Sequence, residues 1–206
     1  MSTNTPTQQN TAEERDVVLR VDGMTKQFAG LTALNDVSLK IHDEEIVGLI
    51  GPNGAGKTTL FNCISGTFPP TDGTVELDGE DITALEAHEV AKRGLARTFQ
   101  VTRPLADLTV LENVMVGAHI NTKRRSEAET IAREKLAFVG LADREQEKAE
   151  DLTVGDQKRL ELARTIATQP DVLLLDEIMA GLTPAETEQM LDLFRELRAD
   201  GMSILI

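Results

Sequence analysis

The order of apolar and polar residues predicts strands early in the chain. Residues 17–21 and 37–41 alternate between apolar and polar side chains, which is the period of half-buried strands. Residues 45–50 form a short apolar run that is typical of a buried strand. Residues 74–77, followed by Asp78-Gly79, have the composition of a hairpin strand and its turn. We therefore expect a β-rich beginning.

Helical spacing replaces this alternation from residue 86 onward. A capping box has Ser or Thr three residues before Glu, and two such patterns open apolar helical stripes here. The first runs from Thr109 to Glu112 and the second from Ser126 to Glu129. Gly140 is a plausible end for the second helix, because glycine readily adopts the left-handed conformation found after a helix.

This order of elements predicts one domain with an inserted helical part. An apolar strand returns near residue 172, so we expect an α-helical subdomain at about residues 87–167 within a domain that covers residues 17–206. Residues 1–16 are rich in Ser, Thr, Asn and Gln, and we expect a disordered polar tail there. The fold class expected from this mixture is α/β.

Length and composition narrow the class further. A chain of 206 residues, 40% hydrophobic and 27% charged, suffices for one globular domain with a sizeable core. No apolar run approaches the roughly 20 residues of a membrane span. Cys63 is the only cysteine, so no disulfide can form within the chain and a reducing compartment is expected. The three histidines lack metal-ligand spacing.

The chain is acidic, with 35 Asp and Glu against 21 Lys and Arg and a formal charge of −14. Nucleic acid is a polyanion, so this balance argues against binding it through bulk electrostatics. An acidic surface fits adaptation to high salt, and it is also common in ordinary bacterial proteins. Both explanations remain open.

The segment from Gly51 to Thr59 carries the clearest chemistry. It satisfies G-x-x-x-x-G-K-[ST] between an expected strand and an expected helix, which is the arrangement of a phosphate-binding loop. The glycines let backbone N–H groups turn inward, Lys57 can reach the β- and γ-phosphates, and the Thr58 hydroxyl can ligate Mg²⁺. The nucleotide-binding residues expected here are Gly51, Pro52, Asn53, Gly54, Ala55, Gly56, Lys57, Thr58 and Thr59.

A second acidic element fits the same chemistry. Residues 172–175 form an apolar strand that ends in Asp176 and Glu177, as in a Walker-B motif. Asp176 would reach the metal, mainly through water, and Glu177 would polarise the attacking water. An acidic pair at a strand end is weak evidence by itself, but it becomes strong beside a phosphate loop.

Residues 152–160, Leu-Thr-Val-Gly-Asp-Gln-Lys-Arg-Leu, resemble the signature segment of ATP-binding cassette (ABC) ATPases, usually Leu-Ser-Gly-Gly-Gln. The resemblance covers roughly residues 17–206, which is nearly all of the chain. It implies a P-loop NTPase of the ABC ATPase type, with a mixed β core, an antiparallel β subdomain and an inserted α-helical subdomain. Phe28 falls at the aromatic position that stacks on adenine, and Gln100 at the glutamine near Mg²⁺ and the attacking water. An ordinary core aromatic and a surface loop residue remain the alternatives for these two.

The resemblance also implies a paired assembly that binds ATP and Mg²⁺. Two such domains enclose two ATP molecules, and the signature of each domain, here Thr153, Gly155 and Asp156, faces the nucleotide held by the other. The catalytic residues implied are Glu177, Gln100 and Lys57; the metal-binding residues implied are Thr58, Gln100 and Asp176.

Three of the departures from the usual pattern bear on the site. Thr153 replaces Ser and keeps a hydroxyl, so little loss is expected. Asp156 replaces Gln and puts a carboxylate near a nucleotide, where we expect it to help cap the following helix. Thr183 stands where Asp or Asn is usual, and Thr183-Pro184-Ala185-Glu186 has the form of a helix cap.

Within the family, residues 94–100, 108–117 and 175–182 most resemble the ATPases of branched-chain amino-acid importers. The resemblance implies a second ATPase subunit, identical or different, transmembrane permeases, and indirectly a periplasmic or extracellular solute-binding protein. It places the chain at the cytoplasmic face of the membrane, with residues 105–117 in the permease contact or simply packing the helical part. The alternatives are a soluble cassette protein of translation or DNA repair, and a nucleotide sensor that does not hydrolyse ATP.

Relatives continue beyond a strand like residues 202–206 into a histidine that contacts the γ-phosphate. The sequence stops at Ile206, before that histidine. We therefore expect a C-terminally truncated cassette with impaired turnover.

Overall fold

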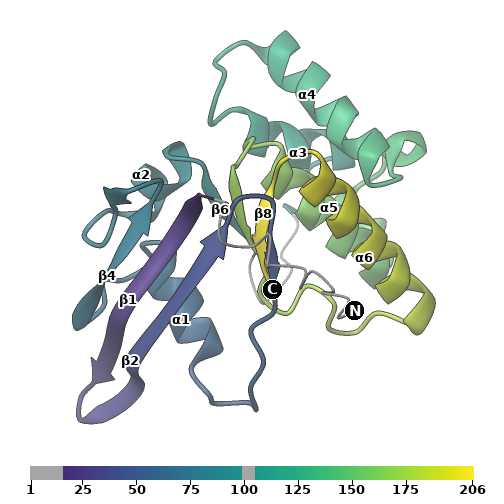
Figure 1. Ribbon diagram of the computed structural model, residues 1–206. Helices are drawn as coiled ribbons and strands as arrows, with labels where there is room; N and C mark the ends of the chain where they lie inside the picture. The colour runs from purple at the N-terminus through teal and green to yellow at the C-terminus, as the bar shows by residue number, and fades with distance from the viewer. Residues whose placement is uncertain (1–15, 99–104) are drawn as a thin grey trace, which may run out of the picture.

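The computed structural model describes residues 16–98 and 105–206. Strands and helices alternate along the chain and form two sheets with helices around them (Figure 1). The strands are β1 (Val17–Phe28), β2 (Leu31–His42), β3 (Ile46–Val47), β4 (Asp72–Leu77), β5 (Glu80–Asp81), β6 (Leu95–Arg97), β7 (Val172–Leu174) and β8 (Ser203–Leu205). The helices are α1 (Lys57–Ile64), α2 (Ala87–Lys92), α3 (Val110–Ala118), α4 (Arg125–Phe138), η1 (Ala142–Arg144), η2 (Ala149–Asp151), α5 (Val154–Ile166) and α6 (Pro184–Ala199).

The first sheet is antiparallel and has the strand order β2-β1-β4-β5. Val21 pairs with Leu39 on one side and with Val75 on the other, so apolar residues of three strands share one buried face. The two strands expected from alternation, and the hairpin expected near Asp78-Gly79, are confirmed. Both alternating strands extend well beyond the predicted residues, because they form one long hairpin.

The second sheet is parallel and has the order β3-β8-β7-β6. The residues of β7 and β8 are all buried, as expected for strands covered on both faces. Parallel strands end at the same edge, so this sheet brings the phosphate loop after β3 close to the acidic pair after β7. The strand predicted at residues 45–50 is shorter than expected: only Ile46–Val47 pair regularly, and Ile50 is almost fully exposed as the chain enters the loop.

Helix caps follow the local sequence in two cases of three. The Thr109–Glu112 and Thr183–Glu186 capping boxes are both present. The cap predicted at Ser126 is wrong, because α4 already begins at Arg125. Thr122 explains the difference: its hydroxyl accepts from the backbone N–H of Arg124 and donates to Glu127, which fixes the helix start two residues earlier than the Ser-Glu pattern suggests.

Helices α3, α4 and α5 pack against one another at one end of the molecule (Figure 1). Leu160 and Ala163 of α5, and Ala167 just after it, are buried in their shared core. The proposed subdomain limits of residues 87–167 stay a prediction, and within them β6 belongs to the parallel sheet. The tail was expected at residues 1–16. Of these only Asp16 is described, and residues 1–15 lie outside the described residues.

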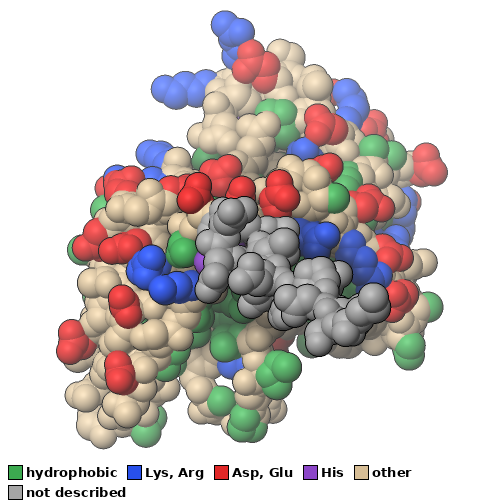
Figure 2. Space-filling view, in the orientation of Figure 1, with side chains coloured by type: hydrophobic (Ala, Val, Ile, Leu, Met, Phe, Trp, Pro, Cys, Tyr) green, Lys and Arg blue, Asp and Glu red, His purple; other side chains and the backbone are tan. Residues whose placement is uncertain are grey.

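Most charged side chains lie at the surface, and the single cysteine lies in the core. On the face shown in Figure 2, acidic side chains are spread among basic ones rather than gathered into one patch. In the part of the chain that the structure describes, no helix has the length and apolarity needed to cross a bilayer. Cys63 is buried in α1 within the core beneath the antiparallel sheet, and burial raises the pKa of its thiol.

Candidate nucleotide-binding site

The loop between β3 and α1 is shaped by glycine. Gly56 occupies the cap position of α1 with φ = 91°, a left-handed conformation that glycine adopts without strain. A Cβ at this position would lie 2.5 Å from the carbonyl oxygen of Ala33, so the loop also needs glycine for its close approach to β2. Because Gly56 has no side chain, the first N–H groups of α1 remain open to a ligand.

Lys57 lies at the first turn of α1, and its ammonium group folds back over the loop. Its Nζ donates to the carbonyl oxygens of Gly51 at 2.5 Å and Pro52 at 3.2 Å. Beside it lies a pocket of about 510 Å³, lined by residues 53–59, residues 31–33 of β2, and Glu177. This pocket combines glycine backbone, an ammonium group, hydroxyls and one carboxylate, which suits a triphosphate.

The acidic pair lies at the carboxyl end of β7. Asp176 is buried, with 3% of its surface exposed, whereas Glu177 reaches the phosphate-loop pocket. Both also line a second pocket of about 270 Å³ that contains Lys57. Glu177 has φ = 50°, a left-handed conformation that is uncommon outside glycine and often occurs at functional sites.

Arg97, the last residue of β6, forms a buried ion pair with Asp176. Its Nη2 donates to Asp176 Oδ2 at 2.9 Å, and the two side chains are 6% and 3% exposed. Its Nη1 donates to Asn62 Oδ1 of α1 at 2.6 Å, and its guanidinium lies over the ring of Phe61. Arg97 therefore ties together the ends of β6 and β7 and the helix that follows the phosphate loop.

Helix α5 begins in the Leu-Thr-Val-Gly-Asp segment. The Thr153 hydroxyl caps it by accepting from the backbone N–H of Asp156 at 3.2 Å. Asp156 lies in the first turn, but the side-chain cap is Thr153, and the Asp156 carboxylate contacts Arg144 at 2.6 Å. Gly155 lies against the Glu186 carboxylate, which a Cβ would overlap. Hydrogen bonds from the backbone and hydroxyl of Thr183 lower the pKa of Glu186.

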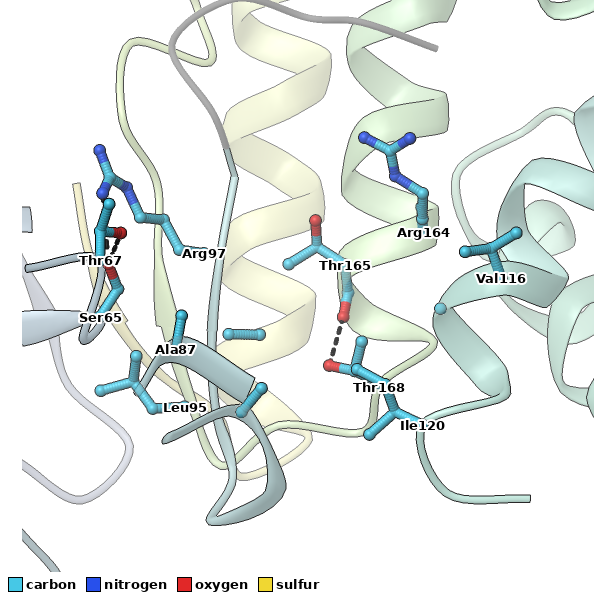
Figure 3. Close-up of a pocket in the computed structure, with 13 residues that line it drawn as sticks. Ser65, Thr67, Ala87, Leu95, Arg97, Val116, Ile120, Arg164, Thr165 and Thr168 are labelled. Carbon is cyan, nitrogen blue, oxygen red and sulfur yellow. Dashed lines mark hydrogen bonds between the residues drawn. The ribbon is translucent and has the colours of Figure 1, made fainter. Parts of the chain in front are cut away.

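A third pocket, of about 350 Å³, lies between α2 and β6 on one side and α3 and α5 on the other. Figure 3 shows Arg97 on one wall and Arg164 on the other, with Val116 and Ile120 along the side formed by α3. Residues 105–117 were expected either to contact a permease or simply to pack the helical part. Val114 takes the second of these roles, because it is fully buried in the helical core.

Known proteins decide the family. The model of the ABC transporter family matches residues 34–180, which is more than half of the chain. The chain is an ABC-transporter ATPase. It is 42% identical over 198 residues to the "High-affinity branched-chain amino acid transport ATP-binding protein BraF" of Pseudomonas aeruginosa, covering 89% of this chain and 78% of that protein. The corresponding LivG protein of Escherichia coli is also 42% identical, over 88% of this chain and 77% of that one.

Solved structures agree with this membership of the ABC family. The ADP conformation of an ATP-binding cassette of an ABC transporter matches with a TM-score of 0.84 and 31% identity, over 93% of this chain and 80% of that one. The expected P-loop fold of the ABC ATPase type and the binding of nucleotide are therefore confirmed. The named relatives are transport proteins, so they give no support to a translation or DNA-repair protein, or to a sensor without turnover.

The ABC cassette brings only part of the predicted site together. Residues 53–59 and Glu177 share one pocket, while Thr153, Gly155 and Asp156 of the described chain lie outside it. Phe28 is 42% exposed, so it is not an ordinary core aromatic; its ring meets Phe68 edge-on, and its contact with adenine stays a prediction. Gln100 lies outside the described residues.

Two arginines of this ABC cassette were missed by sequence analysis. Arg97 lies within residues 94–100, which resemble the importer ATPases, but nothing local indicates that it pairs with Asp176, 79 positions away. Arg144 precedes the signature segment by a short stretch and contacts Asp156. The unusual Asp156 was the sequence signal that could have revealed Arg144, because a carboxylate in that position is stabilised by a nearby cation.

Proposed function

We propose that this ABC ATPase energises the uptake of branched-chain or other hydrophobic amino acids. The names of its relatives support the solute class. One structural observation carries the catalytic part: Lys57, Thr58 and Glu177 line the same pocket. In that pocket Lys57 and the loop N–H groups would bind the phosphates, and Glu177 would accept a proton from the attacking water.

The residues present fit Mg²⁺ beside the nucleotide. Thr58 and Asp176 supply hard oxygen donors, which Mg²⁺ prefers, and the phosphates of ATP would supply the others. Among the described residues no group of three His, Cys, Asp or Glu side chains could hold a metal by itself, which suits an ion that arrives with its nucleotide. When bound, Mg²⁺ neutralises charge on the β- and γ-phosphates. Thr58 would then hold the ion directly and Asp176 through water, with Gln100 as a further proposed ligand.

Two substitutions test these roles. Lys57→Ala removes the ammonium group and should weaken ATP binding, measured by equilibrium titration. Glu177→Gln keeps size and hydrogen bonding but loses the basic carboxylate, so binding should persist while hydrolysis stops. Glu196→Ala, at an exposed position of α6, is a control that should leave both measurements unchanged. Hydrolysis by the Glu177→Gln protein at the parent rate would refute the assignment of the base.

We further propose that the chain works as one of two cassettes. The signature residues lie outside the chain's own pocket, and the N-terminus of α5, where Thr153 is exposed, suits a phosphate offered by another subunit. The partner is a second copy or a related ATPase. ATP binding would close the pair and hydrolysis would reset it, which would drive permease subunits between access states at the cytoplasmic face of the membrane.

The permease contact is proposed at the groove between α2–β6 and α3–α5. Val116 and Ile120 give this groove exposed apolar side chains, and its size suits a short cytoplasmic helix of a permease. A Val116→Cys protein, co-expressed with the permeases and treated with a thiol cross-linker, should capture a permease. The buried thiol of Cys63 contributes little background, and Glu196→Cys, at an exposed position of α6, is a control. Capture of the second ATPase alone would refute the contact.

A further inference from the structure

The carboxylate of Asp156 creates an electrostatic problem at the signature segment. The N-terminus of a helix attracts anions through its open N–H groups and its partial positive charge. Asp156 lies in the first turn of α5, where a negative charge stabilises the helix itself but repels an incoming phosphate. The usual glutamine at this position carries no charge.

Arg144 supplies the opposite charge at short range. Its Nη1 donates to Asp156 Oδ2 at 2.6 Å. Its Nε and Nη2 both donate to Glu147, at 3.0 and 2.6 Å, so Glu147 fixes the guanidinium with the remaining edge turned toward Asp156. These hydrogen bonds raise the pKa of Arg144, with the bond to Glu147 as the largest cause. The cation is held in place rather than free to leave.

The same carboxylate oxygen also controls Thr153. The Thr153 hydroxyl contacts Asp156 Oδ2 at 2.8 Å, so its proton is directed at the oxygen that Arg144 also contacts. The hydroxyl is the donor that the signature offers to a phosphate. A carboxylate already bonded to a guanidinium attracts this proton less strongly. Arg144 therefore makes it easier for the Thr153 hydroxyl to turn from Asp156 toward a phosphate.

A second carboxylate at this end already has its own partners. Glu186 lies against Gly155, is bonded to Thr183, and feels the positive charge of Arg159. The charge introduced by Asp156 is therefore the one that depends on Arg144.

We propose that Arg144 is a positioning residue, which neutralises Asp156 and keeps the N-terminus of α5 able to accept the γ-phosphate of ATP held by a partner cassette. The inference rests on the proposed pairing of cassettes. It makes Arg144 and Asp156 a matched pair: the arginine is needed only while the aspartate is present.

The test measures ATP-driven association in a protein that carries Glu177→Gln, so that bound ATP persists. Size-exclusion chromatography with light scattering gives the MgATP concentration at which half of the protein is associated (half-association). It is measured for the protein alone and for its mixture with the ATPase that co-purifies with its permeases. Arg144→Met should raise this concentration about tenfold. Arg133→Met, which removes an exposed arginine of α4 with the same change in charge, should shift it less than about twofold.

The decisive comparison repeats Arg144→Met in a protein that also carries Asp156→Gln. There the loss of the arginine should shift half-association less than about twofold, because no carboxylate remains to neutralise. Binding of ATP by the separate subunit should be unchanged throughout, which separates this effect from damage to the phosphate loop. Thermal melting checks folding, and Arg144→Gln carries the same test if the Met variant is unfolded.

Two outcomes overturn the inference in different ways. Parent-like association of the Arg144→Met protein, or an equal loss with Asp156→Gln present, rejects the role of Arg144 and leaves the pairing of cassettes intact. Failure of the Glu177→Gln reference to associate, alone or in the mixture, rejects the pairing itself and the inference with it.

Discussion

Arg97→Met should destabilise the protein far more than the loss of any exposed arginine. The substitution leaves the Asp176 carboxylate buried without the guanidinium that balances it, and it removes a 2.6 Å hydrogen bond to Asn62. Removing one partner of a buried ion pair costs about 3–5 kcal/mol, because the remaining charge stays out of water. For a protein of this size that corresponds to a fall in melting temperature of about 6–20 °C.

The free energy of unfolding is measured by urea titration with far-ultraviolet circular dichroism, since the chain has no Trp or Tyr to report by fluorescence. Asp176→Asn in the same protein removes the uncompensated charge and should recover part of the loss. Arg195→Met is the matched control: it removes exposed ion pairs to Glu188 and Asp192 and should cost less than about 1 kcal/mol. An Arg97→Met protein within about 1 kcal/mol of its parent, or a double variant no more stable than the single one, would refute a buried charge pair as the cause.

Three further predictions concern caps and surface charge. Thr183→Ala should lower the free energy of unfolding by about 1 kcal/mol in the same titration, because it removes the cap of α6; an unchanged midpoint would reject the cap. Hydrogen bonds to Thr109 and Thr183 lower the folded pKa of Glu112 and Glu186, so their stabilisation is complete above the ordinary glutamate pKa, about 4.3, and is lost as pH falls through the lower folded value. A Glu112→Gln, Glu186→Gln protein should therefore lose less stability than its parent across that acidic range, and equal losses would contradict this. With a formal charge of −14, the melting temperature should rise between low salt and about 1 M salt as screening relieves repulsion, and a flat response would reject this.

Local signals predicted the parts of the site that local interactions build. The phosphate loop depends on glycines and a helix start within nine residues, and the Thr109 and Thr183 caps depend on a partner three residues away. Ser126 shows the limit of such patterns, since Thr122 competes for the same helix entry from outside the motif. A short pattern says which cap is available, and the neighbouring turn decides which one is used.

Pairs that depend on strand order could not be predicted in this way. Arg97 meets Asp176 because β6 and β7 are neighbours in the parallel sheet, and alternation in the sequence does not specify that order. Helical spacing likewise left two roles open for residues 105–117, and only the packing of α3 against α4 and α5 shows that Val114 belongs to the core rather than to the groove. Val116 and Ile120, on the other face, line that groove.

The burial of Cys63 allows the opening of α1, the helix that follows the phosphate loop, to be measured by thiol labelling. A thiol reacts only as an exposed thiolate, so a buried thiol with a raised pKa is labelled only during the moments when α1 opens. The chain has one cysteine, so every labelling event reports on this helix. The labelling rate therefore reports how often α1 opens. The factor by which ATP slows labelling gives the free energy by which bound nucleotide stabilises the closed state of α1 and the phosphate loop.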